Sequence, residues 1–259
     1  MKEFTLTAYK KILSAVKDAF KDANPCFSEI INSPELNRYL LIRHDVDRDP
    51  EAASRMAEIE AKMGICSSYY FRKMGGGFPS NQIRKIKELG HETGYHYESL
   101  SKSHGDYQLA LKDFEKNLNK LRSITSVKTI SMHGSPLSRF NNLDLWRPVE
   151  RRSLFRDWEL LGDIVLDIDY SETAYISDTG RKWNATSENL RDRVPSSLKL
   201  NVHGTEELIE LIRCGQYKKI VLQIHPERWH ENQVYWFTQL IMDNGANTIK
   251  KIIRKIYQH

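Results

Sequence analysis

Hydrophobic residues recur every three to four positions in several stretches of the chain, a spacing that is typical of amphipathic helices. The first stretch predicts a helix over residues 6–20, with Thr5 or Thr7 as its cap and Asn24-Pro25 beyond its end. Pro at a first helical turn and Gly at a helix end support further predictions. The other predicted helices cover residues 50–63, 81–89, 106–124, 205–214 and 232–257.

Short apolar and β-branched runs lie between these helices and predict strands. The runs are residues 39–43, 65–71, 91–97, 127–132, 164–168, 175–176, 198–202 and 219–224. Strands that alternate with helices of about a dozen residues indicate parallel βαβ units. We therefore expect an α/β fold, a closed or nearly closed, distorted (β/α) barrel of about seven parallel strands.

No linker, repeat or charge block divides the chain, which indicates one domain. Residues 1–37 are expected to form an N-terminal helical extension packed on a (β/α) barrel of residues 38–259. The last predicted helix permits packing on the barrel or pairing with another subunit, so a homo-oligomer is an open alternative. Its apolar positions are Trp236, Leu240, Ile249, Ile252, Ile253 and Ile256.

Composition excludes several classes of protein. The 259 residues are 40% hydrophobic and 28% charged, which excludes a wholly disordered chain. The 39 Lys and Arg are interspersed with 34 Asp and Glu, so the excess of +5 does not indicate a nucleic-acid partner. The apolar runs are too short to span a membrane. The start, residues 1–4, lacks the pattern of a secretory signal, and we expect a cytoplasmic protein.

Cysteine spacing carries little signal. Cys26, Cys66 and Cys214 are far apart, and the sequence has no C-x-x-C pair that would indicate a zinc ribbon or a redox dithiol. We expect free thiols, buried or half-buried, in a reducing compartment.

Polar side chains follow the predicted strands at the same end. The carboxyl ends of parallel strands share one face of an α/β barrel, and this face carries the active site. Residues that are distant in sequence are therefore expected to converge there. The candidates at these strand ends are Asp45, Asp47, His96, Glu98, His133, Asp169 and His225.

Asp45 and Asp47 are two residues apart, so an extended strand places both carboxylates on one face. Two such carboxylates repel each other, and a divalent cation would relieve this. The competing interpretation is that Asp47 or Asp49 caps the helix that begins at Pro50, with an Arg as the partner of the other carboxylate. We favour a metal or catalytic role.

The histidines differ in their prospects. His96 lies at a strand end and is the better ligand candidate, whereas His91 lies at the start of the strand and is expected to be structural. His133 could bind a metal or form a hydrogen bond with a carboxylate. His225 follows an apolar strand and precedes Pro226; we favour a functional role over a satisfied core histidine.

Other residues are candidates for substrate contacts. Arg43 and Arg181 could orient a carboxylate or phosphate, although ion pairs with neighbouring Asp residues explain them equally well. Asp178 and Arg181 lie in a turn that surface chemistry alone would explain. Trp183 could stack on a sugar, although most Trp residues only pack. The predicted substrate-binding set is Arg43, Glu98, Asp169, Asp178, Arg181 and Trp183.

Together these segments resemble the polysaccharide deacetylase (NodB-homology, carbohydrate esterase family 4) superfamily over about residues 38–230. The motifs that carry the resemblance are R-H-D-V-D, G-H-E-T-G-Y-H, M-H-G-S-P and L-Q-I-H. The resemblance implies a catalytic base at Asp45, a metal ligand at Asp47, a second ligand at His96 and a general acid at His225. The chain looks like a divergent branch of the superfamily.

One departure affects the implied metal site. The family's second ligand histidine, four residues after the first, falls on Leu100, which cannot bind a metal. Another residue would have to substitute, with His133 as the first choice and Glu98 as the second; otherwise metal binding is weakened or lost. The ligand types favour Zn²⁺, while Co, Ni and Mn remain compatible.

The leading hypothesis is a metal-dependent hydrolase that removes an N-acyl group from an amino sugar or a related small molecule. The expected substrate is a small carbohydrate or a nucleotide-sugar. Two alternatives stay open. The first is a degenerate, non-catalytic barrel that binds carbohydrate, and the second is a hydrolase of another amide or C–N bond.

Overall fold

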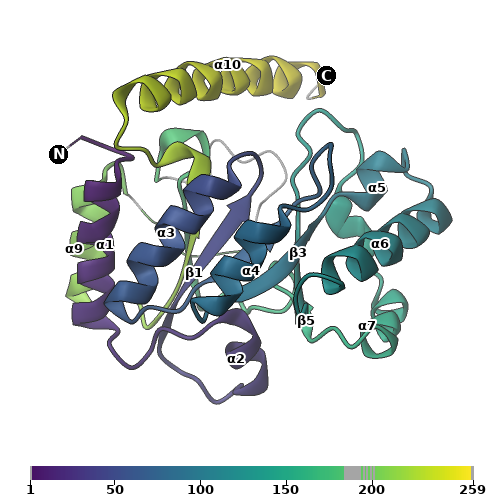
Figure 1. The fold of residues 1–259 in the computed structure, drawn as a ribbon, viewed down its shortest axis with the longest axis horizontal. Coiled ribbons are helices and arrows are strands. Elements are labelled where there is room, and N and C mark those ends of the chain that lie inside the picture. Colours follow the sequence, from purple (N-terminus) through teal and green to yellow (C-terminus); the bar gives the residue numbers. More distant parts are fainter. Residues whose placement is uncertain are drawn as a thin grey trace.

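A parallel β-sheet surrounded by helices forms the body of the molecule (Figure 1). The computed structural model describes residues 2–183, 194, 196, 198, 200 and 202–257; in the last helix, side chains are described as far as Gly245 and at Thr248. The predicted strand over residues 198–202 includes positions that lie outside the described residues.

The sheet has seven strands in the order β5-β4-β3-β2-β1-β7-β6, and every pair of neighbours is parallel. The strands are β1 (Tyr39–Val46), β2 (Ser68–Phe71), β3 (Glu92–Tyr97), β4 (Thr129–Met132), β5 (Gly162–Asp163), β6 (Ala174–Ser177) and β7 (Lys219–Ile224). This confirms the predicted α/β class with seven parallel strands. The described strands leave β5 and β6 as two edges, so the sheet is a curled, incomplete barrel.

Helices connect the strands, and the long ones match the predicted ranges. The α-helices are α1 (Leu6–Ala19), α2 (Phe27–Asn32), α3 (Pro50–Met63), α4 (Ser80–Glu88), α5 (Ser99–Lys102), α6 (Tyr107–Arg122), α7 (Ser153–Asp157), α9 (Thr205–Cys214) and α10 (Gln233–Tyr257). Short 3₁₀ helices are η1 (Asn142–Leu145), η2 (Val149–Arg152), η3 (Thr179–Arg181) and η4 (Pro226–Arg228).

The caps explain why two helices begin and end where the sequence predicts. Thr5 accepts a hydrogen bond from the backbone N–H of Ala8 at the start of α1. Asp49 caps α3 in the same way, by accepting a hydrogen bond from the backbone N–H of Ala52. The helix ends at Gly64, which has the left-handed conformation. The cap of α3 is therefore Asp49, and the carboxylate of Asp47 is left for another role.

Side chains along β1 point alternately to the two faces of the sheet. Leu40 and Ile42 pack in a cluster with buried residues of α1 and α9, whereas Leu41, on the other face, belongs to a second cluster. Because successive side chains point to opposite faces, Arg43 and Asp45 lie on the face of Leu41 and His44 lies on the other. The strand thus carries its charged residues inside the curled sheet.

The prediction of a strand over residues 164–168 was wrong. Strand β5 is only Gly162–Asp163, and the chain turns after it because the side chain of Asp163 accepts a hydrogen bond from the N–H of Val165 at 2.8 Å. The carboxylate of Asp167 in turn accepts from the N–H of Asp163 at 2.7 Å. These short-range side-chain contacts replace strand pairing.

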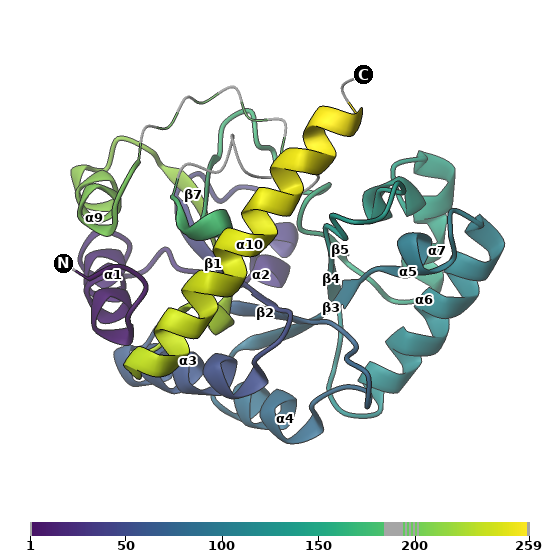
Figure 2. The same cartoon turned by 90° about the horizontal axis from the view of Figure 1, so that it is seen from above.

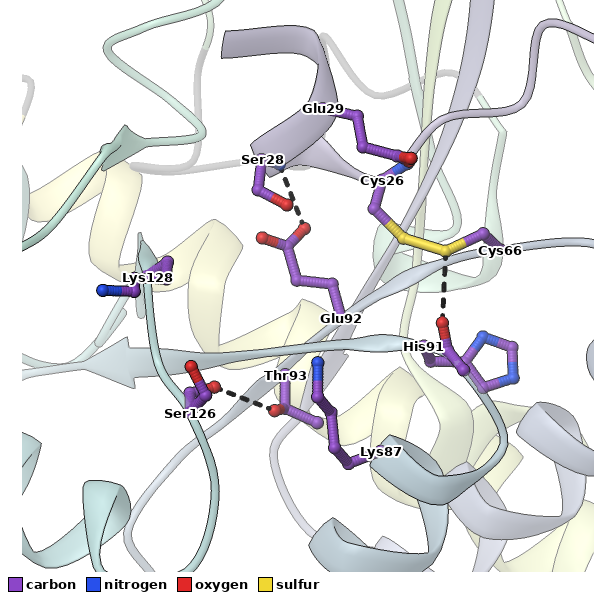
Figure 3. Close-up of a pocket in the computed structure, with 11 residues that line it drawn as sticks. Cys26, Ser28, Glu29, Cys66, Lys87, His91, Glu92, Thr93, Ser126 and Lys128 are labelled. Carbon is purple, nitrogen blue, oxygen red and sulfur yellow. Dashed lines mark hydrogen bonds between the residues drawn. A yellow bond between two sulfur atoms is a disulfide. The ribbon is translucent and has the colours of Figure 1, made fainter. Parts of the chain in front are cut away.

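The expectation of free thiols was wrong for two of the three cysteines. Cys26 and Cys66 form a disulfide, while Cys214 is free and exposed. Figure 3 shows the disulfide beside a pocket of about 260 Å³ that is lined also by Lys87, Glu92 and other polar residues. The two cysteines meet because α2 packs against the start of β2, a contact between segments 40 residues apart that spacing cannot reveal.

α10 lies across the side of the molecule to which the carboxyl ends of the strands point (Figure 1), and Figure 2 shows it crossing above the sheet. None of the helices in the described part of the chain has the length and apolar character needed to cross a membrane.

Candidate active site

Asp45 is fixed at the end of β1 by a set of hydrogen bonds. Arg43 donates from Nε to Oδ1 at 2.8 Å and from Nη2 to Oδ2 at 2.7 Å, and Gln223 of β7 donates to Oδ2 at 2.6 Å. Burial opposes ionisation, but the Arg43 guanidinium and His96 outweigh it and hold the pKa of Asp45 below its usual value. The carboxylate is therefore ionised and has one orientation.

The side chains of Asp47 and His96 face each other, and neither donates a hydrogen bond to the other. The Nδ1 of His96 lies 3.1 Å from the carbonyl oxygen of Ser131, so this nitrogen donates and Nε2 of the neutral ring carries a lone pair. This Nε2 is 3.5 Å from Oδ1 of Asp47 and 3.6 Å from Oδ2 of Asp45. Burial is the main reason that the pKa of His96 is lowered, which favours the neutral ring.

The Oδ1 atom of Asp47 is buried and has no hydrogen-bond partner within the described residues. Burial opposes the charge of Asp47, but His133 and His96 outweigh it and lower the pKa of this carboxyl. A buried anionic oxygen opposite an imidazole lone pair is an arrangement that a cation would stabilise.

His133 lies on the other side of Asp47, at the end of β4. Its Nε2 is 3.8 Å from Oδ2 of Asp47, and its Nδ1 is 3.3 Å from Oε2 of Glu98. Arg72 also approaches this ring, with Nη1 at 3.3 Å from Nε2. Burial opposes the charge of Glu98, but the contacts with His133 and Lys102 lower the pKa of Glu98 to about 2. Glu98 thus orients His133.

The ligand atoms of Asp47, His96 and His133 do not all lie within 4.8 Å of one another. Among the described His, Cys, Asp and Glu residues, the group that meets this spacing is Cys26, Glu29 and Cys66, where both sulfurs are already joined in the disulfide. The predicted ligands therefore surround Asp47 from two sides rather than converge on one point.

His225 ends β7 and is held by Asp178. Its Nδ1 lies 2.6 Å from Oδ1 of Asp178, whose Oδ2 accepts from the backbone N–H of His225 at 3.0 Å. Arg228 and Trp229 also donate to Asp178, at 2.6 and 2.9 Å. Burial and Arg228 oppose protonation of His225, but Asp178 outweighs them and raises the pKa of His225. Burial opposes the charge of Asp178, but Arg228 and His225 lower its pKa to about 2.

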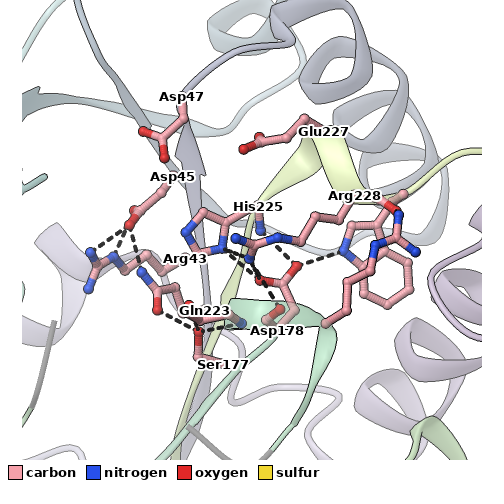
Figure 4. Close-up of polar contacts among 12 residues, drawn as sticks. Arg43, Asp45, Asp47, Ser177, Asp178, Gln223, His225, Glu227 and Arg228 are labelled. Atoms are coloured by element: carbon pink, nitrogen blue, oxygen red, sulfur yellow. Dashed lines mark hydrogen bonds and ion pairs between the residues drawn. The ribbon is translucent and has the colours of Figure 1, made fainter. Parts of the chain in front are cut away.

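Glu227 is a member of this region that the predicted site did not include. Figure 4 shows its side chain beside those of Asp45, Asp47 and His225. It is buried, its Oε1 accepts from Arg48 at 3.3 Å, and its Oε2 has no hydrogen-bond partner among the described residues. Burial and the charge of Asp47 raise the pKa of Glu227. The sequence signal was its position two residues after His225.

The structure does not bring all the predicted substrate residues to this site. Arg43 is fully buried in its pair with Asp45, and Asp178 is fully buried beneath His225. Arg181 pairs with Asp243 of α10 at 3.0 Å rather than with Asp178. Trp183 is buried among aromatic rings, where its Nε1 donates to a threonine.

Asp169 lies at the opposite end of the strands from the candidate site. It lines a pocket together with Tyr39 and Lys219, which begin β1 and β7, so it is at the amino ends of the strands. The turn after β5 carries the chain back to that end. We leave Asp169, Arg181 and Trp183 out of the candidate site.

No protein-family model matches the chain, and no curated protein matches its sequence. Solved structures do match. A CE4 esterase from Streptococcus mutans is 11% identical, with a TM-score of 0.46 over 92% of this chain and 90% of the esterase. A family 4 carbohydrate esterase from Streptomyces lividans, in complex with acetate, is 12% identical, with a TM-score of 0.44 over 82% and 91%.

A CE4 family pseudoenzyme from Bacillus anthracis is 10% identical, with a TM-score of 0.44. The match covers 80% of this chain and 60% of the pseudoenzyme, so the chain spans less than two thirds of that protein. These three matched structures are described as members of carbohydrate esterase family 4, two as esterases and one as a pseudoenzyme.

Proposed function

We propose that the protein is a metal-dependent hydrolase that removes an N-acyl group from an amino sugar or a nucleotide-linked amino sugar. The observation that carries the proposal is the buried Oδ1 of Asp47, which has no hydrogen-bond partner among the described residues and lies opposite the lone pair of His96 Nε2. The two neighbouring groups are a fixed carboxylate, Asp45, and an imidazole with a raised pKa, His225. Acids and bases next to an incomplete polar cluster are typical of catalytic sites.

The donor set suits a divalent cation. We propose Asp47 and His96 as two ligands and His133 as the third, in place of the histidine that Leu100 replaces. His96 has the hydrogen bond from its second nitrogen that metal-binding histidines usually have. The Nδ1 of His133 has Ser135 Oγ as its hydrogen-bond partner at 3.1 Å, with Glu98 beside it at 3.3 Å. To bind the cation, Nε2 of His133 would have to lose its contact with Arg72. Zn²⁺ is the first choice for one carboxylate and two imidazoles.

When bound, the cation would supply positive charge that polarises the acyl carbonyl and acidifies the attacking water. The chain's own part in the reaction is proton transfer. Asp45 accepts the proton of the water as the new C–O bond forms. Its low pKa makes it a weak base, so its contribution rests on position: Arg43 and Gln223 hold both oxygens.

His225 would protonate the amine as the C–N bond breaks. Its Nδ1 is occupied by Asp178, which leaves Nε2 for the substrate. The raised pKa keeps a larger fraction of His225 protonated near neutral pH, as a general acid requires. The products are a carboxylic acid and a neutral amine, and transfer of the proton from Asp45 back to His225 restores both groups, so atoms and protons balance.

Metal analysis combined with an acetate-release assay tests the proposal. We expect purified protein to hold about one transition metal per chain and to release acetate from N-acetylated nucleotide-sugars or amino sugars. Asp47→Asn should lose the metal, and Asp45→Asn should keep it but lose turnover. Asp169→Asn, an exposed carboxylate at the opposite end of the strands, is the matched control and should change neither. Protein without stoichiometric metal and without acetate release would refute the proposal.

A second candidate function is a carbohydrate-binding protein without catalysis. It is favoured by Leu100, a buried apolar residue of α5 at the family's ligand position, and by the spread of the remaining ligand atoms. Calorimetric titration with the same sugars separates the two functions. Binding without metal and without product would support this second candidate.

A further inference from the structure

α10 packs on the molecule through a narrow and largely polar face. Asn232 caps its start by accepting from the N–H of Val234 at 2.9 Å. The residues that face inward are Trp236, Gln239, Leu240 and Asp243, of which Gln239 and Asp243 are buried. They recur every three to four positions, as one face of a helix does.

Ion pairs hold Asp243 against the body of the protein. Its Oδ2 accepts from Nε of Arg181 at 3.0 Å, and its Oδ1 lies 3.6 Å from Arg48 and 3.8 Å from Arg228. These arginines follow β6, β1 and β7, so the helix is attached beside the carboxyl ends of the strands. Figure 2 shows the same placement, with α10 crossing above the sheet.

The opposite face of α10 is apolar and exposed, the reverse of the usual arrangement in a surface helix. Its side chains have exposed fractions of 72% for Val234, 65% for Tyr235, 58% for Phe237, 58% for Ile241 and 48% for Met242. Five large apolar side chains thus face outward within nine residues. An exposed patch of this kind marks an interaction surface rather than a folding requirement.

Charge indicates the chemistry of the partner. After Asp243 the sequence of the chain has no acidic residue, and α10 contains Lys250, Lys251, Arg254 and Lys255. A helix that combines an exposed apolar face with several cations is suited to the interface of an anionic membrane. We propose that α10 binds the protein to the surface of an anionic phospholipid membrane, with Phe237 and Ile241 inserted among the lipids.

A second copy of the chain is a poorer match for this surface. Pairing of two α10 helices would bring together two segments that are each rich in cations, and the single acid of each helix, Asp243, already makes three ion pairs inside its own protomer. Lipid phosphates supply the missing negative charge. The charge pattern therefore favours a membrane.

The proposal extends beyond the hydrolase activity and stands independently of it. Because α10 lies beside the carboxyl ends of the strands, membrane binding would bring the candidate active site close to the lipid headgroups. Substrates attached to a membrane would then be within reach. The test below measures binding alone, so its result does not depend on whether the site is catalytic.

Vesicle co-sedimentation of the full chain tests the proposal. We expect binding to vesicles of phosphatidylcholine and phosphatidylglycerol, little binding to phosphatidylcholine alone, and weaker binding at high salt. The double variant Phe237→Ser and Ile241→Ser should bind at least about tenfold less, since two apolar side chains are lost from the lipid contact. Leu137→Ser is the matched control: Leu137 is 76% exposed and lies outside α10, and its loss should leave binding unchanged.

Circular dichroism should show that both variants retain the native helix content, because the substituted side chains are exposed. Failure of the wild type to bind anionic vesicles would overturn the proposal, as would equal binding by the double variant. Light scattering tests the alternative, in which a second copy of the chain covers the apolar face of α10. A wild-type dimer that the double variant converts to a monomer would assign this face to a second copy of the chain.

Discussion

Replacement of Asp178 by Asn tests the electrostatic account of His225 most directly. The buried carboxylate accepts two hydrogen bonds from His225 and others from Arg228 and Trp229. Asn has the same shape but no charge, much like a protonated Asp. The variant therefore isolates the part of the free energy of unfolding that depends on the negative charge.

The size of this contribution follows from the pKa of Asp178, which falls from 3.8 to about 2 in the folded protein. A folded-state pKa below the unfolded value stabilises the protein above the unfolded pKa, and the contribution is lost as the pH falls toward 2. At 1.36 kcal/mol per pKa unit, the charge contributes about 2 kcal/mol at pH 6 and roughly half as much at pH 3.

Urea denaturation of wild type and Asp178→Asn at pH 6 and pH 3 measures this difference. We expect the variant to be less stable by about 2 kcal/mol at pH 6 and by roughly half as much at pH 3. Asp169→Asn should change stability by less than about 0.5 kcal/mol, because Asp169 is exposed. A difference for Asp178→Asn that is below about 0.5 kcal/mol, or that does not shrink in acid, would refute the reasoning.

Two other predictions concern the fold. Removing the disulfide by Cys26→Ala and Cys66→Ala should lower the free energy of unfolding by about 2–4 kcal/mol, since a loop of about 40 residues is released in the unfolded chain. The same loss is expected for the wild type in reductant. Equal urea midpoints for the wild type and the variant would contradict the prediction. Gly94→Ala should cost about 1–3 kcal/mol because its Cβ would lie 2.5 Å from the ring of Tyr70. Gly76→Ala, where the Cβ meets nothing within 4 Å, is the control, and equal thermal stability of the two variants would contradict this account.

Most of the helices could be predicted because the signals that define them are local. In α3, Asp49, Pro50 and Gly64 set the two ends, and the apolar spacing between them sets the buried face. The strand over residues 164–168 could not be excluded in the same way. Its apolar run is buried as a strand would be, and only the contacts of Asp163 and Asp167 reveal a turn.

The sequence predicted which residues of the candidate site lie at the carboxyl ends of strands, but it did not predict the contacts between them or the path of every connecting segment. Parallel strands bring Asp45, Asp47, His96 and His133 to one edge of the sheet, a consequence of topology that the motifs allowed us to anticipate. Asp169 shared the same sequence pattern and lies at the other edge. The difference arises in the path of the chain after β5, which has no local signature.

The sequence by itself determined the α/β class, the long helices and the strand ends on which Asp and His gather, because periodicity, caps and strand alternation act over a few residues. Tertiary structure alone decided that Asp178 supports His225, that Cys26 meets Cys66, and that α10 presents its apolar face outward. Each of these depends on segments tens to hundreds of residues apart. These contacts form only when the folded chain brings the segments together, so the sequence shows no repeating pattern that would predict them.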